Sequence, residues 1–444
     1  MDPMFRNVAC RVLVVFVMAG CGSVKSPGAA ADAGSPGSDA GSGSPDAGAP
    51  DAALACAPST TSCAADMVTV CGSDGQVMRT EACSLGCNTA GNACLKLDPS
   101  NGLASAIDGA ATGPAVLFDA STTATTINTD TGAVMHNGAA VTLPSVVVIQ
   151  PGLPNIRAFQ VKSLVVQNPI TVSGAAALAF VSDGDVTISS TITLAGRSFT
   201  PGPGAVVDAA TACAGRNITI ANQLAPGPGG GGFGTAGAAG GAANGTTGGA
   251  PGTVAGADTL VPLRGGCVGG FVTGSGSIAG AGGGALQVSS RTKITVTTAG
   301  VVDAGGGGGA FFLVGGGGGS GGGILLEAAV VAVGGTLAAN GGGGACGVTA
   351  GEDGRTTPRA GSASGLAALG GACSDPSQGS GGHGGTRDAG PRVGSNATGS
   401  SGTIVGGGGG GSVGRIRVNT RSGTFTETGA LISPVASQGT AHTR

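Results

Sequence analysis

Glycine is the feature of this sequence that most restricts how the chain can fold. There are 94 glycines in 444 residues, and 73 of them lie in residues 201–444. Each glycine in a regular element costs about 0.5–1 kcal/mol relative to alanine, because its backbone loses more freedom on folding. A region this rich in glycine therefore either stays loose or recovers the loss through dense backbone hydrogen bonding. The question of loose or hydrogen-bonded backbone concerns above all the uninterrupted glycine blocks, which are residues 229–232, 305–309, 315–319, 341–344 and 406–411.

The rest of the composition excludes several classes of function. The chain has no Trp or Tyr, three His, 10% charged residues and a net charge of −3. Such a chain has neither the positive field nor the stacking side chains with which proteins bind nucleic acid. It also has no Gly-Lys-Ser/Thr sequence, so a P-loop nucleotide site is excluded. We expect no nucleic acid, nucleotide or cofactor as a partner.

Residues 1–20 have the pattern of a secretion signal. Arg6 and Arg11 give a positive start, and the apolar stretch that follows, Val12–Ala19, is too short to span a bilayer. The sequence Met18-Ala19-Gly20-Cys21 resembles the lipobox of bacterial lipoproteins. This resemblance implies cleavage before Cys21, a lipid on that cysteine, and anchoring at the outer membrane or cell surface of a Gram-negative bacterium. An ordinary signal peptide is the alternative.

Residues 21–55 follow the signal and consist almost wholly of Gly, Ser, Pro, Asp and Ala. Such a segment has too little apolar surface to offset the entropy of ordering. We therefore expect a disordered tether between the lipidated Cys21 and the rest of the protein.

Ten further cysteines remain after Cys10, in the signal, and Cys21. Six lie close together, and in an exported protein an even cluster indicates disulfides. They define a module over residues 56–97, with a hairpin predicted from Met67–Val70 and Gln76–Arg79. Metal binding is the alternative, although the segment has no CxxC pair and no His. The six are Cys56, Cys63, Cys71, Cys83, Cys87 and Cys94. Their pattern resembles small EGF-like modules of bacterial surface proteins, and all fifteen connectivities stay open.

The other four cysteines are spread through the glycine-rich region. Pairing of sequence neighbours predicts the disulfides Cys213–Cys267 and Cys346–Cys373. We expect these bonds to link parts of the glycine-rich region to one another.

Residues 101–434 repeat one unit of three short strands and a glycine stretch. One copy runs through residues 285–288, 293–296 and 300–304 into Gly305–Gly309, and the next through 324–327, 330–333 and 335–340 into Gly341–Gly344. This pattern predicts an all-β solenoid of stacked coils with long glycine insertions, followed by a tail at 435–444. The body resembles the right-handed parallel β-helix of the pectin-lyase-like and adhesin type. The glycine blocks resemble those of surface proteins with bundled polyglycine-II helices, and flexible loops are the alternative.

The sequence offers few candidates for catalysis. Asp183 and Asp185 form the one close acidic pair on a strand turn, and His136, His383 and His442 match no metal motif. We therefore assign no catalytic or metal-binding residue. We expect a lipoprotein with a structural or adhesive role, which contacts the membrane through its lipid and binds polysaccharide or other surface proteins. A polysaccharide lyase or hydrolase is the alternative. A third and more remote alternative is binding of ice or another surface by a threonine-rich strand such as Thr295–Thr298.

Overall fold

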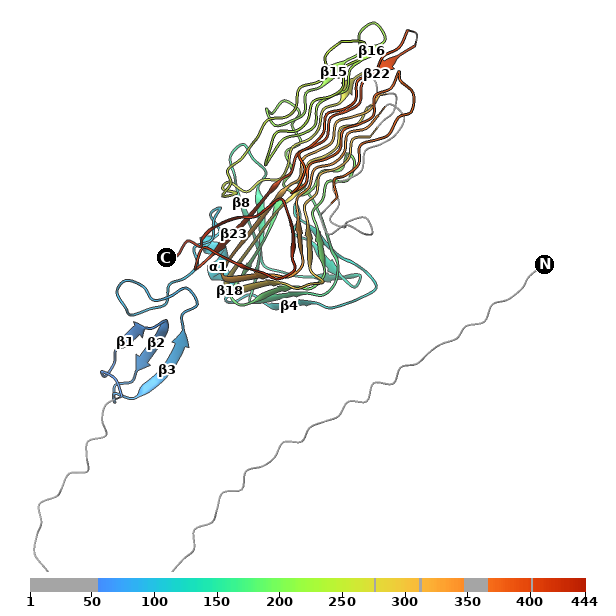
Figure 1. Cartoon of the computed structure of the whole chain (residues 1–444). Coiled ribbons are helices and arrows are strands. Elements are labelled where there is room, and N and C mark those ends of the chain that lie inside the picture. Colours follow the sequence, from blue (N-terminus) through green and yellow to red (C-terminus); the bar gives the residue numbers. More distant parts are fainter. Residues whose placement is uncertain (1–54, 275–276, 311–313, 347–365, 401) are drawn as a thin grey trace, which may run out of the picture. The chain divides into compact units, whose positions relative to one another are not determined.

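The computed structural model describes residues 55–274, 277–310, 314–346, 366–400 and 402–444 (Figure 1). The predicted signal (1–20), Cys21 and the tether up to residue 54 lie outside the described residues. Residues 54–444 form one compact unit. Its described part is almost wholly β, with one helix of seven residues, α1 (Ala104–Ala110). No described helix has both the length and the apolar character to cross a membrane.

The cysteine-rich module is a small antiparallel sheet. Its strands are β1 (Thr61–Ala64), β2 (Met67–Cys71) and β3 (Val77–Ala82), and β2 pairs with both neighbours. The predicted hairpin is thus present as β2 and β3, whereas β1 was not predicted. Every residue of β3 is exposed, and the buried cluster of the module is only Cys63, Val68 and Cys83. A core this small needs covalent stabilisation, and disulfides join Cys56 to Cys71, Cys63 to Cys87 and Cys83 to Cys94.

The apolar body is built from three ladders of parallel strands, and the chain visits them in turn. The first ladder is β9 (Ile156–Val161), β12 (Ala177–Ser182), the first half of β18 (Ala285–Val296), the first half of β20 (Gly323–Val333), β23 (Arg415–Thr420) and β26 (Ser437–Thr440). The second is β4 (Ala115–Phe118), β10 (Ser163–Val166), β13 (Val186–Ile188), the second halves of β18 and β20, and β24 (Thr426–Glu427). The third is β5 (Thr125–Asn128), β11 (Ile170–Ser173), β14 (Thr191–Thr193), β19 (Val301–Asp303), β21 (Thr336–Ala338) and β25 (Leu431–Ser433).

Antiparallel strands close one edge of this arrangement. β6 (Val134–His136) and β7 (Ala139–Val141) extend the third ladder beyond β5, and β8 (Ser145–Val148) pairs with β9. Val146–Ile149 has the β-branched pattern of the repeating strands, but β8 runs antiparallel to its neighbour β9. Its pairing covers the backbone groups of β9, and β8 itself is the end strand of that sheet. At the other edge, the predicted tail 435–444 contains β26, which pairs with β23.

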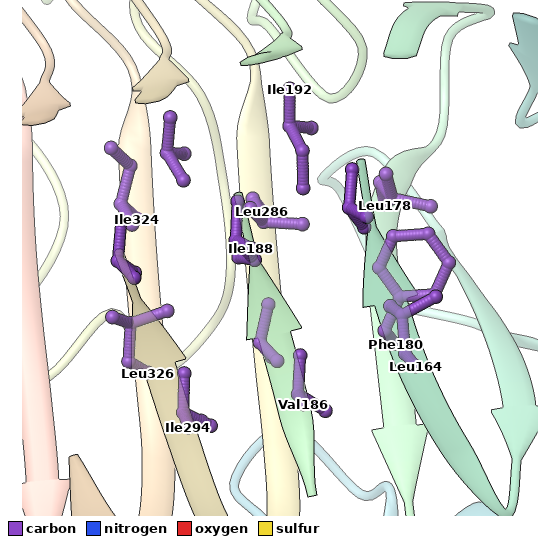
Figure 2. Packing of buried hydrophobic residues seen from close by; sticks show 14 of the residues in the cluster. Leu164, Leu178, Phe180, Val186, Ile188, Ile192, Leu286, Ile294, Ile324 and Leu326 are labelled. Carbon is purple, nitrogen blue, oxygen red and sulfur yellow. The ribbon is translucent and has the colours of Figure 1, made fainter. Parts of the chain in front are cut away.

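The core lies between the three ladders. Inward side chains on neighbouring strands are in register, so that one column on the first ladder holds Leu178, Leu286 and Ile324 (Figure 2). A second column, on the second ladder, holds Val186 and Ile294. All five side chains are completely buried. Burial of alternate residues in β10, β13 and β14 is the period of two that identified these segments as strands in the sequence.

All three glycine-rich insertions begin after the third ladder and end at the first. Residues 194–284 connect β14 to β18, residues 304–322 connect β19 to β20, and residues 339–414 connect β21 to β23. Their described tracts run side by side beyond the ladders (Figure 1). We call these tracts the glycine array. Short parallel pairs occur within it, between β15 (Ile218–Thr219) and β17 (Val272–Thr273) and between β16 (Leu224–Ala225) and β22 (Ile404–Val405).

Hydrogen bonds in the glycine array repeat every three residues. In the tract 314–323, Gly316, Gly319 and Gly322 donate to the tract 304–310, Gly317 and Ser320 to the tract 264–270, and Gly318 and Gly321 to the tract 404–414. In the tract 404–414, residues 406, 409 and 412 donate to the tract 225–231, residues 407 and 410 to the tract 392–395, and residues 408, 411 and 414 to the tract 339–345. A strand alternates between two directions, whereas an extended threefold helix turns each third residue to the same neighbour. The described glycine blocks are therefore ordered and bonded on several sides.

At many glycines of these tracts, the spacing leaves no room for a side chain. A Cβ on Gly318 would collide with the carbonyl oxygen of Gly342, and a Cβ on Gly408 with that of Gly316. In both cases the obstacle is backbone, which cannot rotate away as a flexible side chain can. Glycine is thus required here for close approach of neighbouring chains.

Two disulfides link tracts of the glycine array. They are Cys213–Cys267 and Cys346–Cys373, the two pairs of sequence neighbours. Arg264 donates from Nη2 to the sulfurs of Cys213 and Cys267, at 3.2 and 2.9 Å. Burial lowers the pKa of the Arg264 guanidinium, which packs over the Phe233 ring at 5.4 Å. The first disulfide is therefore buried in the array and in contact with a half-buried cation.

Gly318→Ala tests whether close approach of backbones stabilises the protein. We expect a loss of at least about 1–3 kcal/mol in the free energy of unfolding, because the new methyl group overpacks against fixed backbone. The measurement is urea unfolding of the oxidised protein followed by circular dichroism. The matched control is Gly390→Ala, where a Cβ meets nothing within 4 Å. Equal stability of the two variants would contradict the packing described above.

Candidate functional site

Asp183 and Asp185, the acidic pair at the turn between β12 and β13, accept hydrogen bonds from side chains of the neighbouring strand β18. Asp183 accepts a hydrogen bond from Arg291 Nη1 at 2.5 Å, and Asp185 accepts one from Thr292 Oγ1 at 2.5 Å. Arg291 also donates to Asp108 at 2.7 Å. Both carboxylates of the pair therefore bond to the bend of β18, and these hydrogen bonds join the β12–β13 turn to that strand.

Three sulfurs of the cysteine-rich module lie within 4.8 Å of one another, those of Cys63, Cys83 and Cys87. Each of these cysteines is in a disulfide. A cysteine binds metal as its thiolate, and a disulfide sulfur does not supply one. The proximity of these sulfurs is thus a consequence of two neighbouring disulfides.

A carboxylate, an imidazole and a hydroxyl form a chain of hydrogen bonds that the sequence analysis missed. His136 Nε2 bonds to Asp119 Oδ1 at 2.6 Å, and His136 Nδ1 bonds to Thr125 Oγ1 at 2.8 Å. This is the order of groups that activates a nucleophile in hydrolases. However, Thr125 is completely buried, and Asn168 donates to Thr123 O and Ser121 Oγ beside it. A substrate has no access to the Thr125 hydroxyl, so the chain of hydrogen bonds joins β5 to β6.

The other two histidines contribute backbone groups to the fold. The His383 carbonyl accepts a hydrogen bond from the Arg392 N–H within the glycine array. The His442 carbonyl accepts one from the Asp98 N–H. Their positions do not bring the three histidines of the chain into one cluster among the described residues.

Glu327 is a buried carboxylate on the outward face of the first ladder. Only 1% of the residue is exposed. Its oxygens accept hydrogen bonds from the Ser100 N–H at 3.1 Å and Ser100 Oγ at 2.6 Å, from Gln287 Nε2 at 2.8 Å, from Ser289 Oγ at 3.1 Å and from Asn419 Nδ2 at 3.0 Å. All five donors are neutral. The carboxylate has too little exposure to meet a substrate, and it ties the segment before α1 to the first ladder.

The Glu327 network depends on strand register. Ser289, Glu327 and Asn419 occupy the same level on β18, β20 and β23. They are 38 and 92 residues apart in the sequence. No local pattern marks them as partners, although a single Glu in the apolar run Ile324–Val333 is a signal that a search for buried charge would have found.

An open cavity of about 410 Å³ lies on the outward face of the third ladder. Its polar wall consists of Thr171 and Ser173 on β11, Thr193 on β14, and Arg197 and Thr200 in the turn that follows, with Pro201 beside them. We call these six residues the β11–β14 groove. The volume lies within the range of small-ligand sites in proteins. The groove is therefore large enough to hold a small ligand.

Register places the hydroxyl groups of the groove in a row. Thr193 is directly opposite Thr171, and Thr171 is opposite Thr126 on β5. Neighbouring strands are about 4.8 Å apart, so the row presents hydroxyls at that interval. The threonines singled out in the sequence lie elsewhere, on the second half of β18 and after it, where Thr295 is opposite Thr187 and Ala332.

Glu327→Ala tests the structural role of the buried carboxylate. The change leaves several buried donors without an acceptor, and we expect the free energy of unfolding to fall by at least about 3 kcal/mol. Urea unfolding followed by circular dichroism measures this. Glu427→Ala, at an exposed position of β24, is the control and should change stability by less than about 0.5 kcal/mol. A small effect at Glu327 would show that the network contributes little.

No protein-family model matches this chain, and no curated protein or solved structure matches it either. The arrangement of its own residues is therefore what indicates a function.

Proposed function

We propose that the protein is a cell-surface lipoprotein with a structural or adhesive role, in which a stiff body holds a glycan-binding groove away from the membrane. The observation that carries this proposal is the threefold hydrogen bonding of the glycine array beside the three strand ladders. An extensively bonded body of this kind suits a scaffold. The groove on the third ladder supplies a surface for a partner.

The body is, in this proposal, a β-solenoid with a polyglycine-II bundle inserted at one corner of its coils. Strand triplets such as β9–β10–β11 and β12–β13–β14 pair rung on rung in parallel, as stacked coils of a repeat protein do. The three-residue period of hydrogen bonding supports the assignment of the array to threefold helices.

Export and anchoring rest on two independent features. The sequence Met18-Ala19-Gly20-Cys21 has the lipobox pattern. Ten cysteines of the described part form five disulfides, and such bonds persist in oxidising compartments. Both support a location outside the cytoplasm, with the lipid on Cys21 as the membrane contact.

Cys21→Ser tests the anchor. In a Gram-negative host that expresses the full chain, we expect radioactive palmitate to label the wild-type protein and leave the variant unlabelled. The variant should also leave the membrane fraction, because lipid chains supply about 0.8 kcal/mol for each buried methylene group. Cys10→Ser is the control and should keep the label. Equal labelling of the Cys21→Ser variant would refute lipidation at this cysteine.

Co-sedimentation tests the adhesive role. The unlipidated Cys21→Ser protein is mixed with insoluble polysaccharides, including the deproteinised extracellular matrix of the host, and pelleted. We expect the protein in the pellet and no release of soluble sugar. Protein that stays in the supernatant with every polysaccharide would contradict the adhesive role, and release of reducing ends or unsaturated sugars would instead favour a polysaccharide hydrolase or lyase.

A further inference from the structure

We propose that the β11–β14 groove binds a sugar residue that carries an anionic group, with the Arg197 guanidinium on the anion and the threonine row on the sugar hydroxyls. This inference rests on the proposed contact with polysaccharide and names the chemical class that the groove selects.

Charge on the wall of the groove is the first reason. Arg197 is the one charged residue among those that line the cavity, and it is exposed. Its backbone is fixed, because the N–H donates to the Thr200 carbonyl at 2.9 Å and its own carbonyl accepts from the Thr200 N–H at 2.8 Å. No hydrogen bond or ion pair found among the described residues uses its side chain. A planar guanidinium on an exposed residue of the cavity lining matches carboxylate, sulfate or phosphate oxygens.

Nearby carboxylates do not pair with Arg197. Asp130 accepts backbone hydrogen bonds from Ala175 at 2.8 Å and Ala176 at 3.4 Å, which fixes the segment after β11. Asp303 lies opposite Thr193 on the next strand and accepts the Gly305 N–H at 3.0 Å. Neither residue lines the cavity. The net charge of the groove wall is therefore positive.

The hydroxyl row is the second reason. Thr171 and Thr193 face the cavity from adjacent strands in register, and Ser173 lies two residues further along β11 on the same face. Hydroxyls both donate and accept, as do the hydroxyls of a sugar. Rigid strands hold these groups in place, so a sugar meets a prearranged surface.

An exposed aromatic ring is the third reason. Phe199 lies in the turn between Arg197 and Thr200, and 65% of it is exposed. Among the described phenylalanines it is the one classed as exposed, whereas Phe118, Phe159, Phe180 and Phe233 are fully buried. Phe199 itself does not line the cavity, but Arg197 and Thr200 of the same turn do, so its exposed ring offers an apolar face to the C–H side of a sugar that extends beyond the groove.

The experiment is isothermal titration calorimetry of the full Cys21→Ser protein with matched oligosaccharides that differ only in one group: carboxylated, sulfated or neutral. We expect binding of the anionic forms and at least about tenfold weaker binding of the neutral form. The carboxylated and sulfated arms show which anion the groove prefers. Equal affinity for all three forms, or no binding of any, would overturn the inference.

Variants then assign the binding to the groove. Arg197→Gln should weaken binding of the anionic form about 10- to 100-fold, and Thr193→Val, which keeps the shape and removes the hydroxyl, about 2- to 10-fold. Arg392→Gln, at an exposed arginine of the glycine array, and Thr187→Val, on the second ladder, are the matched controls and should bind as the parent does. Circular dichroism confirms that each variant is folded.

Failure of this inference is separable from failure of the proposed function. Unchanged binding in folded Arg197→Gln would overturn the groove assignment and leave the surface role intact. A wild-type protein that takes up no palmitate, or a protein that does not co-sediment with any polysaccharide, would count against the surface role, and both are measured without any groove variant.

Discussion

Close approach of backbones is the constraint on which the glycine array depends. Each tract lies so near its neighbours that the position of a Cβ on Gly318 or Gly408 is occupied by a carbonyl group of another tract. Backbone N–H and C=O groups removed from water must be paired, and here they pair with up to three neighbouring tracts in turn. A glycine costs about 0.5–1 kcal/mol more than an alanine on folding, which is similar to the net contribution of one hydrogen bond. Dense bonding therefore offsets the cost that the composition imposes.

The ladders and the array determine each other's register. An insertion begins directly after β14, β19 or β21 and ends directly before β18, β20 or β23. Each insertion leaves one strand of the third ladder and returns to the next strand of the first ladder. The positions of these strands therefore fix the register between neighbouring glycine tracts. In return, the Cys213–Cys267 disulfide and the bonds between tracts fix insertions that would otherwise be long loops with a large entropy of closure.

The polar side chains described above serve mainly to join neighbouring strands and turns of the body. Glu327, Asp183 and the Asp119–His136–Thr125 chain each bond to segments from another strand or turn. The β11–β14 groove differs, because the Arg197 guanidinium and the hydroxyls of Thr171 and Thr193 have no such bond among the described residues and line an open cavity. That difference is why binding is proposed at the groove, although the acidic pair and the histidines were more conspicuous in the sequence.

The sequence alone determined the local elements. Alternation of apolar residues with Thr or Ser identified Val186–Ile188 and Thr191–Leu194 as strands, and turn residues identified the hairpin of β2 and β3. These features follow from periods of two and from turn chemistry, which act over a few residues. Tertiary structure alone decided that β8 is antiparallel, that Glu327 meets Ser100 and Asn419, and that Arg197 stands beside Thr171 and Thr193. It also decided that the described glycine blocks are ordered, because a glycine carries no side-chain pattern and its hydrogen-bond partner lies in another tract of the chain.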